Sequence, residues 1–202
     1  MPDFLYEQNA KEKGYKFICG VDEAGRGPLA GPVCAAAVIL PEGLEIEGLN
    51  DSKKLTEAKR EKLFDIIIEK AVSYSVAFGT VEEIEQYNIL NATFIAMNKA
   101  IEGLDVKPDY ALIDGNRVPK GIKIDCETVI KGDAKSASVA AASVLAKVTR
   151  DRLLLRYSEK YPEYGFEKHK GYGTAAHYEA VRKYGLCPVH RPSFFKKFFE
   201  EK

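Results

Sequence analysis

The sequence predicts a mixed α/β protein in which a strand meander comes first, strands then alternate with helices, and a small helical part ends the chain. Short runs rich in aromatic and β-branched residues alternate with longer segments whose apolar residues recur at helical spacing. From Pro162 onward the chain becomes aromatic and basic. We therefore expect a main domain over residues 1–161 and a helical C-terminal extension, residues 162–202, packed on it.

Five segments are typical of β-strands, and glycine and proline residues separate the first two, which predicts a tight loop between neighbouring strands. The expected strands cover residues 15–22 (YKFICGVD), 33–40 (VCAAAVIL), 73–79 (SYSVAFG), 109–114 (DYALID) and 126–130 (CETVI).

Helical spacing of apolar residues predicts helices over residues 56–71, 88–104 and 135–161, and a further one over 174–185 in the extension. Thr56 is suited to cap the first helix, and Gly103 to end the second. The first half of segment 135–161 consists almost wholly of Ala, Ser and Val. Small side chains let a helix lie close against a sheet, so we expect this helix to be central.

Composition indicates an ordinary globular protein, with 46% hydrophobic and 30% charged residues among 202. No apolar stretch is long enough to cross a bilayer, and the N-terminus lacks the layout of a signal peptide, so we expect a cytoplasmic location. The four cysteines are far apart and form no CxxC pair. This pattern argues against disulfides and structural zinc.

The net charge of zero conceals an asymmetry between the two parts of the chain. Residues 1–130 hold 15 basic and 22 acidic side chains, a net charge of −7, whereas residues 131–202 hold 15 and 8, a net charge of +7. An acidic part beside a basic part could hold cations next to phosphates. A chance distribution of solvated surface charge explains the same numbers equally well.

The phrase CGVDEAGRG, residues 19–27, places two acids at the end of an apolar run, directly before a glycine-rich loop. Residues 25–30 fit the dinucleotide-binding pattern G-x-G-x-x-A, with Glu47 downstream. That pattern works only when the loop opens a helix. Pro28, Gly31 and Pro32 interrupt the segment, and a strand-like run follows, so dinucleotide binding is disfavoured.

A metal site is the second interpretation, because four acids lie where strands end or a helix begins: Asp22, Glu23, Asp114 and Asp133. Loops converge at such places in α/β sheets, so these carboxylates could meet. Hard divalent cations such as Mg²⁺ or Mn²⁺ take oxygen ligands of this kind. No His or Cys is placed to make a zinc site.

Each acid also has a structural explanation. Asp133 could cap the helix that follows it, and Asp114 before Gly-Asn could form a turn. Asp22 and Glu23 are neighbours, and neighbours on a regular strand point to opposite faces. A shared site therefore requires the backbone to bend within residues 22–25, where the glycines make a bend easy.

Five motifs, in this order, are similar to those of bacterial ribonuclease HII, the type 2 ribonuclease H: DEAGRGPLAGPV, LNDSKKL, LIDGN, KGDAKSASVAAASVLAKVTRD and HKGYGT. The resemblance runs from about Tyr15 to Phe194. It implies a ribonuclease H-like fold with a mixed five-stranded sheet flanked by helices. It also implies endonucleolytic cleavage of the RNA strand of RNA–DNA hybrids, including cleavage 5′ of single ribonucleotides embedded in duplex DNA.

The resemblance further implies that the four acids are catalytic and hold two divalent ions, Mg²⁺ or Mn²⁺. One ion would activate a water and the other would stabilise the leaving 3′ oxygen, which leaves 3′-hydroxyl and 5′-phosphate ends. Four clustered carboxylates are tolerable only when cations compensate their repulsion. We therefore expect partial protonation or disorder in the cluster without metal.

The resemblance implies substrate contacts from six residues: Gly25, Arg26, Gly27, Ser52, Lys53 and Tyr172. The glycine loop would read the ribose 2′-hydroxyl, the tyrosine would pack on the sugar of the adjacent deoxynucleotide, and the Ser-Lys pair would contact phosphate. Taken alone, Arg26 could form a salt bridge to a neighbouring acid. Tyr172 could simply pack against the protein, and DSKKLT could be a polar helix start.

A non-catalytic hybrid-binding protein on the same fold is the alternative function, although a binder needs no converging carboxylates facing a polyanion. We expect a monomer. The terminal segment HRPSFFKKFFEEK departs from the more basic ending associated with the family. Its FF-KK-FF pattern favours an amphipathic helix docked on the body, with a surface for a clamp-type partner protein as the alternative.

Overall fold

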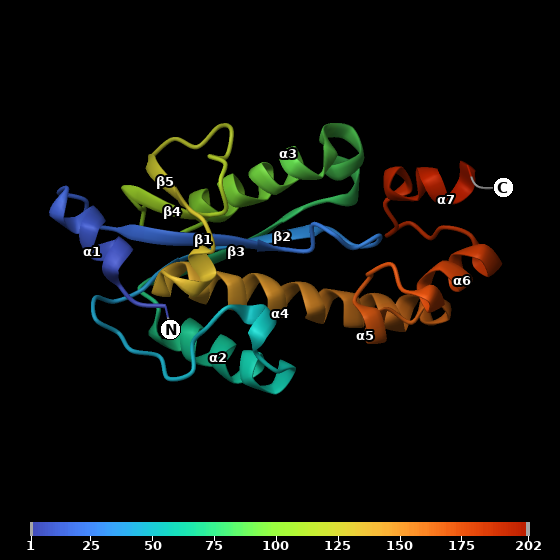
Figure 1. The fold of residues 1–202 in the computed structure, drawn as a ribbon, viewed down its shortest axis with the longest axis horizontal. Helices are drawn as coiled ribbons and strands as arrows, with labels where there is room; N and C mark the ends of the chain where they lie inside the picture. The colour runs from blue at the N-terminus through green and yellow to red at the C-terminus, as the bar shows by residue number, and fades with distance from the viewer. Residues whose placement is uncertain (1, 201–202) are drawn as a thin grey trace.

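The computed structural model describes residues 2–200, and the backbone alone of residues 197 and 198. Five strands form one sheet in the order β3-β2-β1-β4-β5 (Figure 1). The strands are β1 (Ile18–Ala24), β2 (Val33–Ile39), β3 (Ser73–Gly79), β4 (Tyr110–Asp114) and β5 (Asp125–Val129). β2 pairs antiparallel with both β1 and β3, whereas β1, β4 and β5 run parallel. The expected mixed five-stranded sheet is confirmed.

Helices cover both faces of this sheet (Figure 1). They are α1 (Leu5–Glu12), α2 (Glu57–Lys70), α3 (Val81–Glu102), α4 (Ala137–Lys160), α5 (Phe166–His169), α6 (Ala175–Tyr184) and α7 (Lys196–Glu200). The apolar core on one face joins α3 to alternate residues of β1 and β2, and the core on the other face joins α2 and α4 to β2. The sheet therefore has one layer of helix on each side.

Two helices differ from the sequence-based expectation. α3 begins at Val81 and not at residue 88, because Thr80 and Glu83 form a reciprocal capping box. Asn88 interrupts it with a left-handed φ of 67°, and its Oδ1 accepts the N–H groups of Leu90 and Asn91, which restarts the helix. The expected start is thus an internal kink. α1 has no counterpart among the expected elements.

α4 lies unusually close to β1. A Cβ atom added to Gly20 would overlap the backbone of Ser138 and Val139, so only glycine fits this position of the strand. The Ala, Ser and Val residues of the helix from 137 to 146 are buried, which confirms the expectation of a central helix. The close approach fixes the start of α4 against the middle of the sheet.

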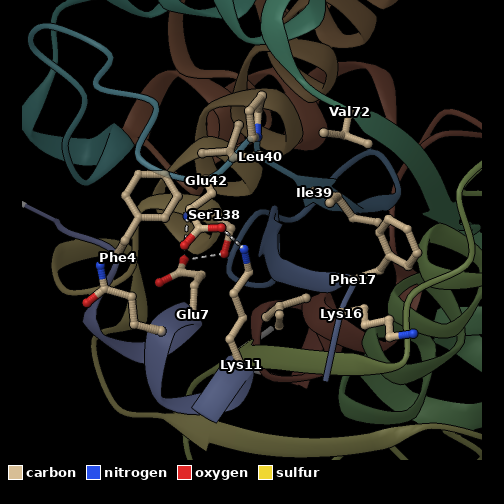
Figure 2. A pocket seen from close by; sticks show the side chains of 13 residues that line it. Phe4, Glu7, Lys11, Lys16, Phe17, Ile39, Leu40, Glu42, Val72 and Ser138 are labelled. Carbon is tan, nitrogen blue, oxygen red and sulfur yellow. Dashed lines mark hydrogen bonds and ion pairs between the residues drawn. The ribbon is translucent and has the colours of Figure 1, made fainter. Parts of the chain in front are cut away.

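The start of α4 is also held by α1. Glu7 Oε1 accepts hydrogen bonds from Ser136 Oγ (2.6 Å), Ser138 N (3.0 Å) and Ser138 Oγ (2.5 Å). Figure 2 shows Glu7 and Ser138 pointing toward each other from the two helices, beside a pocket that Phe4, Lys11 and Glu42 also line. Because Ser136 is the N-cap of α4, these bonds fix the turn that carries Asp133 just before it.

The C-terminal segment packs on the loop between β1 and β2. Leu29 and Ala30 of that loop share a buried cluster with Leu154 of α4 and with Phe166 and Phe195. Phe195 anchors the amphipathic end of the chain, whereas Phe199 of α7 is largely exposed. The division at residue 161 stays a prediction. Within residues 2–200, no helix has the length and apolar character needed to cross a membrane.

We predict that Gly20→Ala destabilises the protein by about 3 kcal/mol or more, because backbone atoms of α4 cannot rotate out of the way of the added methyl group. Urea unfolding followed by circular dichroism measures this loss. Gly43→Ala is the control, since a Cβ there meets open space and only its positive φ adds about 1–2 kcal/mol. Equal losses for both variants would contradict the close packing.

Candidate active site

Four acids gather at one edge of the sheet. Asp22 and Glu23 lie near the end of β1, Asp114 is the last residue of β4, and Asp133 lies in the short 3-10 turn Gly132–Ala134. β1 and β4 are parallel neighbours, with Val21 paired to Ile113, so their carboxyl ends coincide. Asp114 Oδ1 accepts the N–H of Gly132 at 2.7 Å, which ties the strand end to the turn before α4.

The two neighbouring acids of β1 face opposite layers. Asp22 is paired with Ala36, which packs on the α4 side, and Glu23 with Ala35, which packs on the α3 side. The strand stays paired with β2 through Ala24, so the backbone does not bend between the two acids themselves. The bend expected within residues 22–25 comes at Gly25, where the chain leaves the strand with a φ of +96°. The acids instead straddle the edge of the sheet.

Asp22 is the electrostatic centre of this cluster. Burial raises the pKa of its carboxyl well above the ordinary value, and repulsion from Glu23, Asp114 and Asp133 adds to the rise. The hydrogen bond that Asp22 Oδ1 accepts from Glu23 N (2.7 Å) opposes the rise only in part. Without cations, the carboxyl of Asp22 therefore takes up a proton at a higher pH than an ordinary aspartate does.

The pKa values of Glu23 and Asp133 are raised as well. Burial is the main cause for both, and the charge of Asp114 adds to it. The guanidinium of Arg26 opposes the rise at Glu23 and the ammonium of Lys53 opposes it at Asp133. The expected protonation of the metal-free cluster thus has a clear physical cause.

Lys53 lies close enough to the acids for their charges to act on its ammonium group. Burial alone would lower the pKa of its ammonium, but the carboxylates of Asp22 and Asp133, with Asp51, raise it. Asp51 also caps the 3-10 turn Ser52–Lys54, because its Oδ1 accepts the N–H of Lys53 at 2.9 Å. The structure therefore brings this expected site residue to the acidic edge.

Ser52 lies differently from its neighbour. Its side chain is buried, and its hydroxyl accepts a hydrogen bond from Ser143 Oγ of α4 at 2.7 Å. Arg60 Nη1 donates to its carbonyl oxygen at 3.0 Å. The side chain of Ser52 is thus engaged inside the protein and braces the turn from which Lys53 projects.

The four acids suit a hard divalent cation, because they offer carboxylate oxygens as ligands at one edge of the sheet. Within residues 2–200, no three or more His, Cys, Asp or Glu side chains already surround a common ion position. Mg²⁺ and Mn²⁺ keep waters and take substrate phosphate oxygens, so they need few protein ligands each. The acids could hold such ions when their oxygens supply only part of each coordination shell.

The glycine loop and Tyr172 meet beside the acids. A Cβ added to Gly27 would lie 3.7 Å from the Tyr172 ring, which is 47% exposed. Arg26 is exposed, and its Nη1 donates to Glu23 Oε1 at 3.3 Å, so the salt bridge considered as its alternative role is present. Gly25 cannot carry a side chain, because a Cβ there would overlap Arg150.

Sequence reasoning missed several residues of this region. Glu23 and Asp114 line one cleft together with Asn116 and Arg117, which follow β4. The sequence offered one signal for the last two, since they come directly after the strand-end acid. The cleft also includes Thr93 of α3 and other α3 side chains, whose position depends on tertiary packing.

Two buried arginines were also missed. Arg150 of α4 and Arg191, near the C-terminal end, donate hydrogen bonds to backbone carbonyls of the loop between β1 and β2. A single arginine in a sequence gives no sign that it is buried. The dinucleotide interpretation is excluded by β2, because the glycine loop leads into a strand and not a helix.

Known proteins resemble this chain over nearly its whole length. The family profile described as Ribonuclease HII matches residues 19–200. The Ribonuclease HII of Clostridioides difficile strain 630 is 55% identical over 192 residues, which are 95% of this chain and 75% of that protein.

Solved structures give the same result for the fold. The crystal structure of ribonuclease H2 from Pyrococcus horikoshii OT3 superposes with a TM-score of 0.76 at 30% identity, covering 93% of this chain and all of that one. RNase HII of Archaeoglobus fulgidus, solved in a complex with PCNA, has a TM-score of 0.67 at 26% identity, covering 87% of this chain and 94% of that one.

We predict that Asp22→Asn makes the metal-free protein more stable at neutral pH. A raised carboxyl pKa adds stability only at low pH, and that stability is lost as the pH rises through the folded-state pKa, so the neutral amide removes the loss. Thermal melts in chelator, from acidic to neutral pH, should show a flatter pH dependence for the variant.

The same melts test the metal site. Mn²⁺ should raise the melting temperature of the parent protein, because an ion that binds only the folded state stabilises that state. The increase should be smaller for Asp22→Asn, which lacks one of the proposed carboxylate ligands. Asp65→Asn, an exposed change on α2, is the matched control and should behave as the parent. An equal Mn²⁺ effect on parent and Asp22→Asn would remove Asp22 from the metal site.

Proposed function

The chain belongs to the ribonuclease HII family, and we propose that it cuts duplex DNA on the 5′ side of single embedded ribonucleotides as well as long RNA–DNA hybrids. As a ribonuclease H, it is a metal-dependent endonuclease that hydrolyses phosphodiester bonds of RNA in RNA–DNA hybrids. The observation that carries the proposal is the position of the four acids beside an exposed glycine loop and Tyr172.

We propose that the four acids hold two divalent ions, Mg²⁺ or Mn²⁺. Bound ions would supply an activated water and stabilise the leaving 3′ oxygen, so that cleavage leaves 3′-hydroxyl and 5′-phosphate ends. Asp22 and Glu23 would contribute oxygens from the two sides of β1, and Asp114 and Asp133 from the adjoining strand end and turn. The raised pKa of Asp22 supports this role, because a cation would relieve the repulsion.

The positive charge of Lys53 would contact a backbone phosphate beside the scissile one. The carboxylates already act on its ammonium group, and metal ions bound to them would leave that group to an incoming phosphate. Ser52 would act by bracing the turn, since its hydroxyl is bonded to Ser143. The basic excess of residues 131–202 supports binding of a polyanion next to the acidic edge.

The loop Gly25, Arg26 and Gly27 would read the ribose. Glycines allow backbone groups to approach a sugar closely, and the 2′-hydroxyl is the group that distinguishes RNA from DNA. Tyr172 stands beside Gly27 with half of its side chain exposed, which suits packing on the sugar of the next deoxynucleotide. Recognition and chemistry would thus share one edge of the sheet.

The alternative function, non-catalytic hybrid binding, explains less of the site. A buried carboxylate such as Asp22, crowded by other acids, reduces stability and repels a nucleic acid unless it holds cations. We further propose a monomer acting in the cytoplasm. A sliding clamp, the kind of protein with which the Archaeoglobus relative was solved, is the partner to test at α7, where Phe199 is exposed.

The direct test is a nicking assay on a DNA duplex with one ribonucleotide, in Mg²⁺ or Mn²⁺ and in chelator. A nick 5′ of the ribonucleotide that requires the metal is expected, with 3′-hydroxyl and 5′-phosphate ends. A parallel assay on a continuous RNA–DNA hybrid measures the activity of the family separately from cleavage at a single ribonucleotide. Cleavage of the hybrid alone would reject the proposed action at single ribonucleotides.

Asp114→Asn should reduce the cleavage rate by at least about 100-fold, because the neutral amide weakens metal binding at the centre of the site. Hybrid affinity in chelator should stay largely intact, since phosphate contacts supply most of it. Electrophoretic cleavage and fluorescence binding assays measure the two effects, with Asp65→Asn as the exposed control. Loss of folding in Asp114→Asn would instead support a structural role as a turn former.

Tyr172→Ala should slow cleavage at an isolated ribonucleotide by about tenfold or more, because the sugar loses an aromatic surface. Its melting temperature should stay close to that of the parent, since the ring is half exposed. Tyr184→Ala, which removes an equally exposed ring from α6, is the control and should keep the parent rate. Parent-like cleavage by Tyr172→Ala would remove this residue from the substrate site.

A further inference from the structure

Arg191 lies fully inside the protein, 0% exposed, and its side chain bonds to the glycine loop. It donates four hydrogen bonds to backbone carbonyl oxygens: to Gly25 (2.7 Å), Arg26 (3.1 Å), Pro28 (2.7 Å) and Gly31 (2.7 Å). The backbone N–H of Arg191 also donates to the Leu29 carbonyl at 2.9 Å. One side chain therefore holds a loop that precedes it by about 160 residues.

A buried guanidinium is costly unless hydrogen bonds replace its hydration. Burial and the nearby Arg150 lower the pKa of Arg191 to about 9, and its four side-chain hydrogen bonds all go to neutral carbonyls. Arg150 holds the remaining part of the loop, because it donates hydrogen bonds to the carbonyl oxygens of Ala30 and Pro32. Burying two neighbouring arginines is unfavourable, and the fixed backbone geometry of this loop is what their hydrogen bonds provide.

The bonds of Arg191 determine where the amide N–H groups of the loop point. In a trans peptide the C=O and the following N–H point in opposite directions, and no cis peptide bond occurs within residues 2–200. The carbonyls of Gly25 and Arg26 face inward to Arg191. The N–H groups of Arg26 and Gly27 consequently face outward.

The next peptide of the loop shows the same relation. The Pro28 carbonyl faces Arg191, and the following N–H, of Leu29, donates on the other side to the Gly171 carbonyl at 2.8 Å. Gly171 directly precedes Tyr172, so the loop is fixed to Arg191 on one side and to the Tyr172 segment on the other.

The outward N–H groups of Arg26 and Gly27 stand ready for a ligand. Both residues are exposed, and no hydrogen bond within residues 2–200 engages either N–H. The Tyr172 ring lies close to Gly27, and Glu23 is paired with the Arg26 side chain. The two donors thus lie between the proposed sugar contact and the acids.

We propose that Arg191 is a positioning residue for ribose recognition, which by holding the Gly25 and Arg26 carbonyls inward aims the N–H groups of Arg26 and Gly27 at the 2′-oxygen of the ribonucleotide. This rests on the proposed function. It assigns a specificity role to the C-terminal extension, because the residue that orders the recognition loop comes from there. Arg191 itself touches no substrate.

The decisive variant is Arg191→Lys, which keeps the positive charge but offers one nitrogen that cannot reach four carbonyls. Affinity is measured in chelator for a duplex with one ribonucleotide and for the all-DNA duplex of the same sequence. The preference for the ribonucleotide duplex, given by the ratio of the two dissociation constants, should fall about tenfold toward unity. This is the loss expected when two N–H donors no longer point at the 2′-oxygen. Arg152→Lys, an exposed change on α4, should keep the parent ratio.

A purely structural role of Arg191 would weaken binding of both duplexes alike. An equal loss for the two duplexes, or an unchanged ratio, would therefore overturn the proposal. Thermal melts of both arginine variants show whether the compared proteins are folded.

Amide exchange of the parent protein, followed by NMR, tests the geometry without any variant. The Arg26 and Gly27 amides should exchange quickly in the free protein and slowly when the ribonucleotide duplex is bound, but not when the all-DNA duplex is bound. The Leu29 amide should be protected throughout, because it is bonded to Gly171. Protection of Arg26 and Gly27 in the free protein, or by both duplexes equally, would contradict the proposal.

Failure of the proposed function is visible separately. If the parent does not nick the ribonucleotide duplex in Mn²⁺ and binds both duplexes equally, the proposed function fails and the role of Arg191 fails with it. If the parent nicks and discriminates while Arg191→Lys keeps the parent ratio, only the role of Arg191 is wrong.

Discussion

The close packing of α4 on β1 is the constraint on which the rest of the structure depends. Gly20 and the small residues at the start of α4 let the helix approach the strand until no Cβ fits between them. The start of the helix thereby brings Asp133 to the edge where β1 and β4 end. Further along the same helix, Arg150 reaches the carbonyls of the glycine loop. One packing contact thus positions both the acids and the loop.

The acidic edge is built at the expense of stability. Burial and mutual repulsion raise the pKa of Asp22, and nearby carboxylates raise the pKa of Lys53. Such conflicts between local electrostatics and stability mark functional sites, because a site suited to cations is unfavourable without them. The glycine loop shows a second cost of the same kind, since two buried arginines donate hydrogen bonds to its backbone.

Much of this architecture could be predicted from the sequence, because periodicity and strand-end acids are local signals. The spacing of apolar residues gave β3 and α2 nearly to the residue, and the Ala-rich run gave the central position of α4. The first turns of α3 were missed, since its polar start and Asn88 hide the helix. The inward side chain of Ser52 and the burial of Arg191 depend on partners far away in the sequence, which no local pattern reveals.

In the proposed mechanism, divalent cations relieve the repulsion among the four acids and complete this site. Isothermal titration of Mn²⁺ into the protein, in buffers of different ionisation enthalpy between about pH 5 and pH 7, tests it most directly, because metal binding displaces protons from carboxyls of raised pKa. We expect saturable binding with a heat that varies with the buffer, because such variation reports proton release. Absence of binding, or binding with the same heat in every buffer, would contradict it.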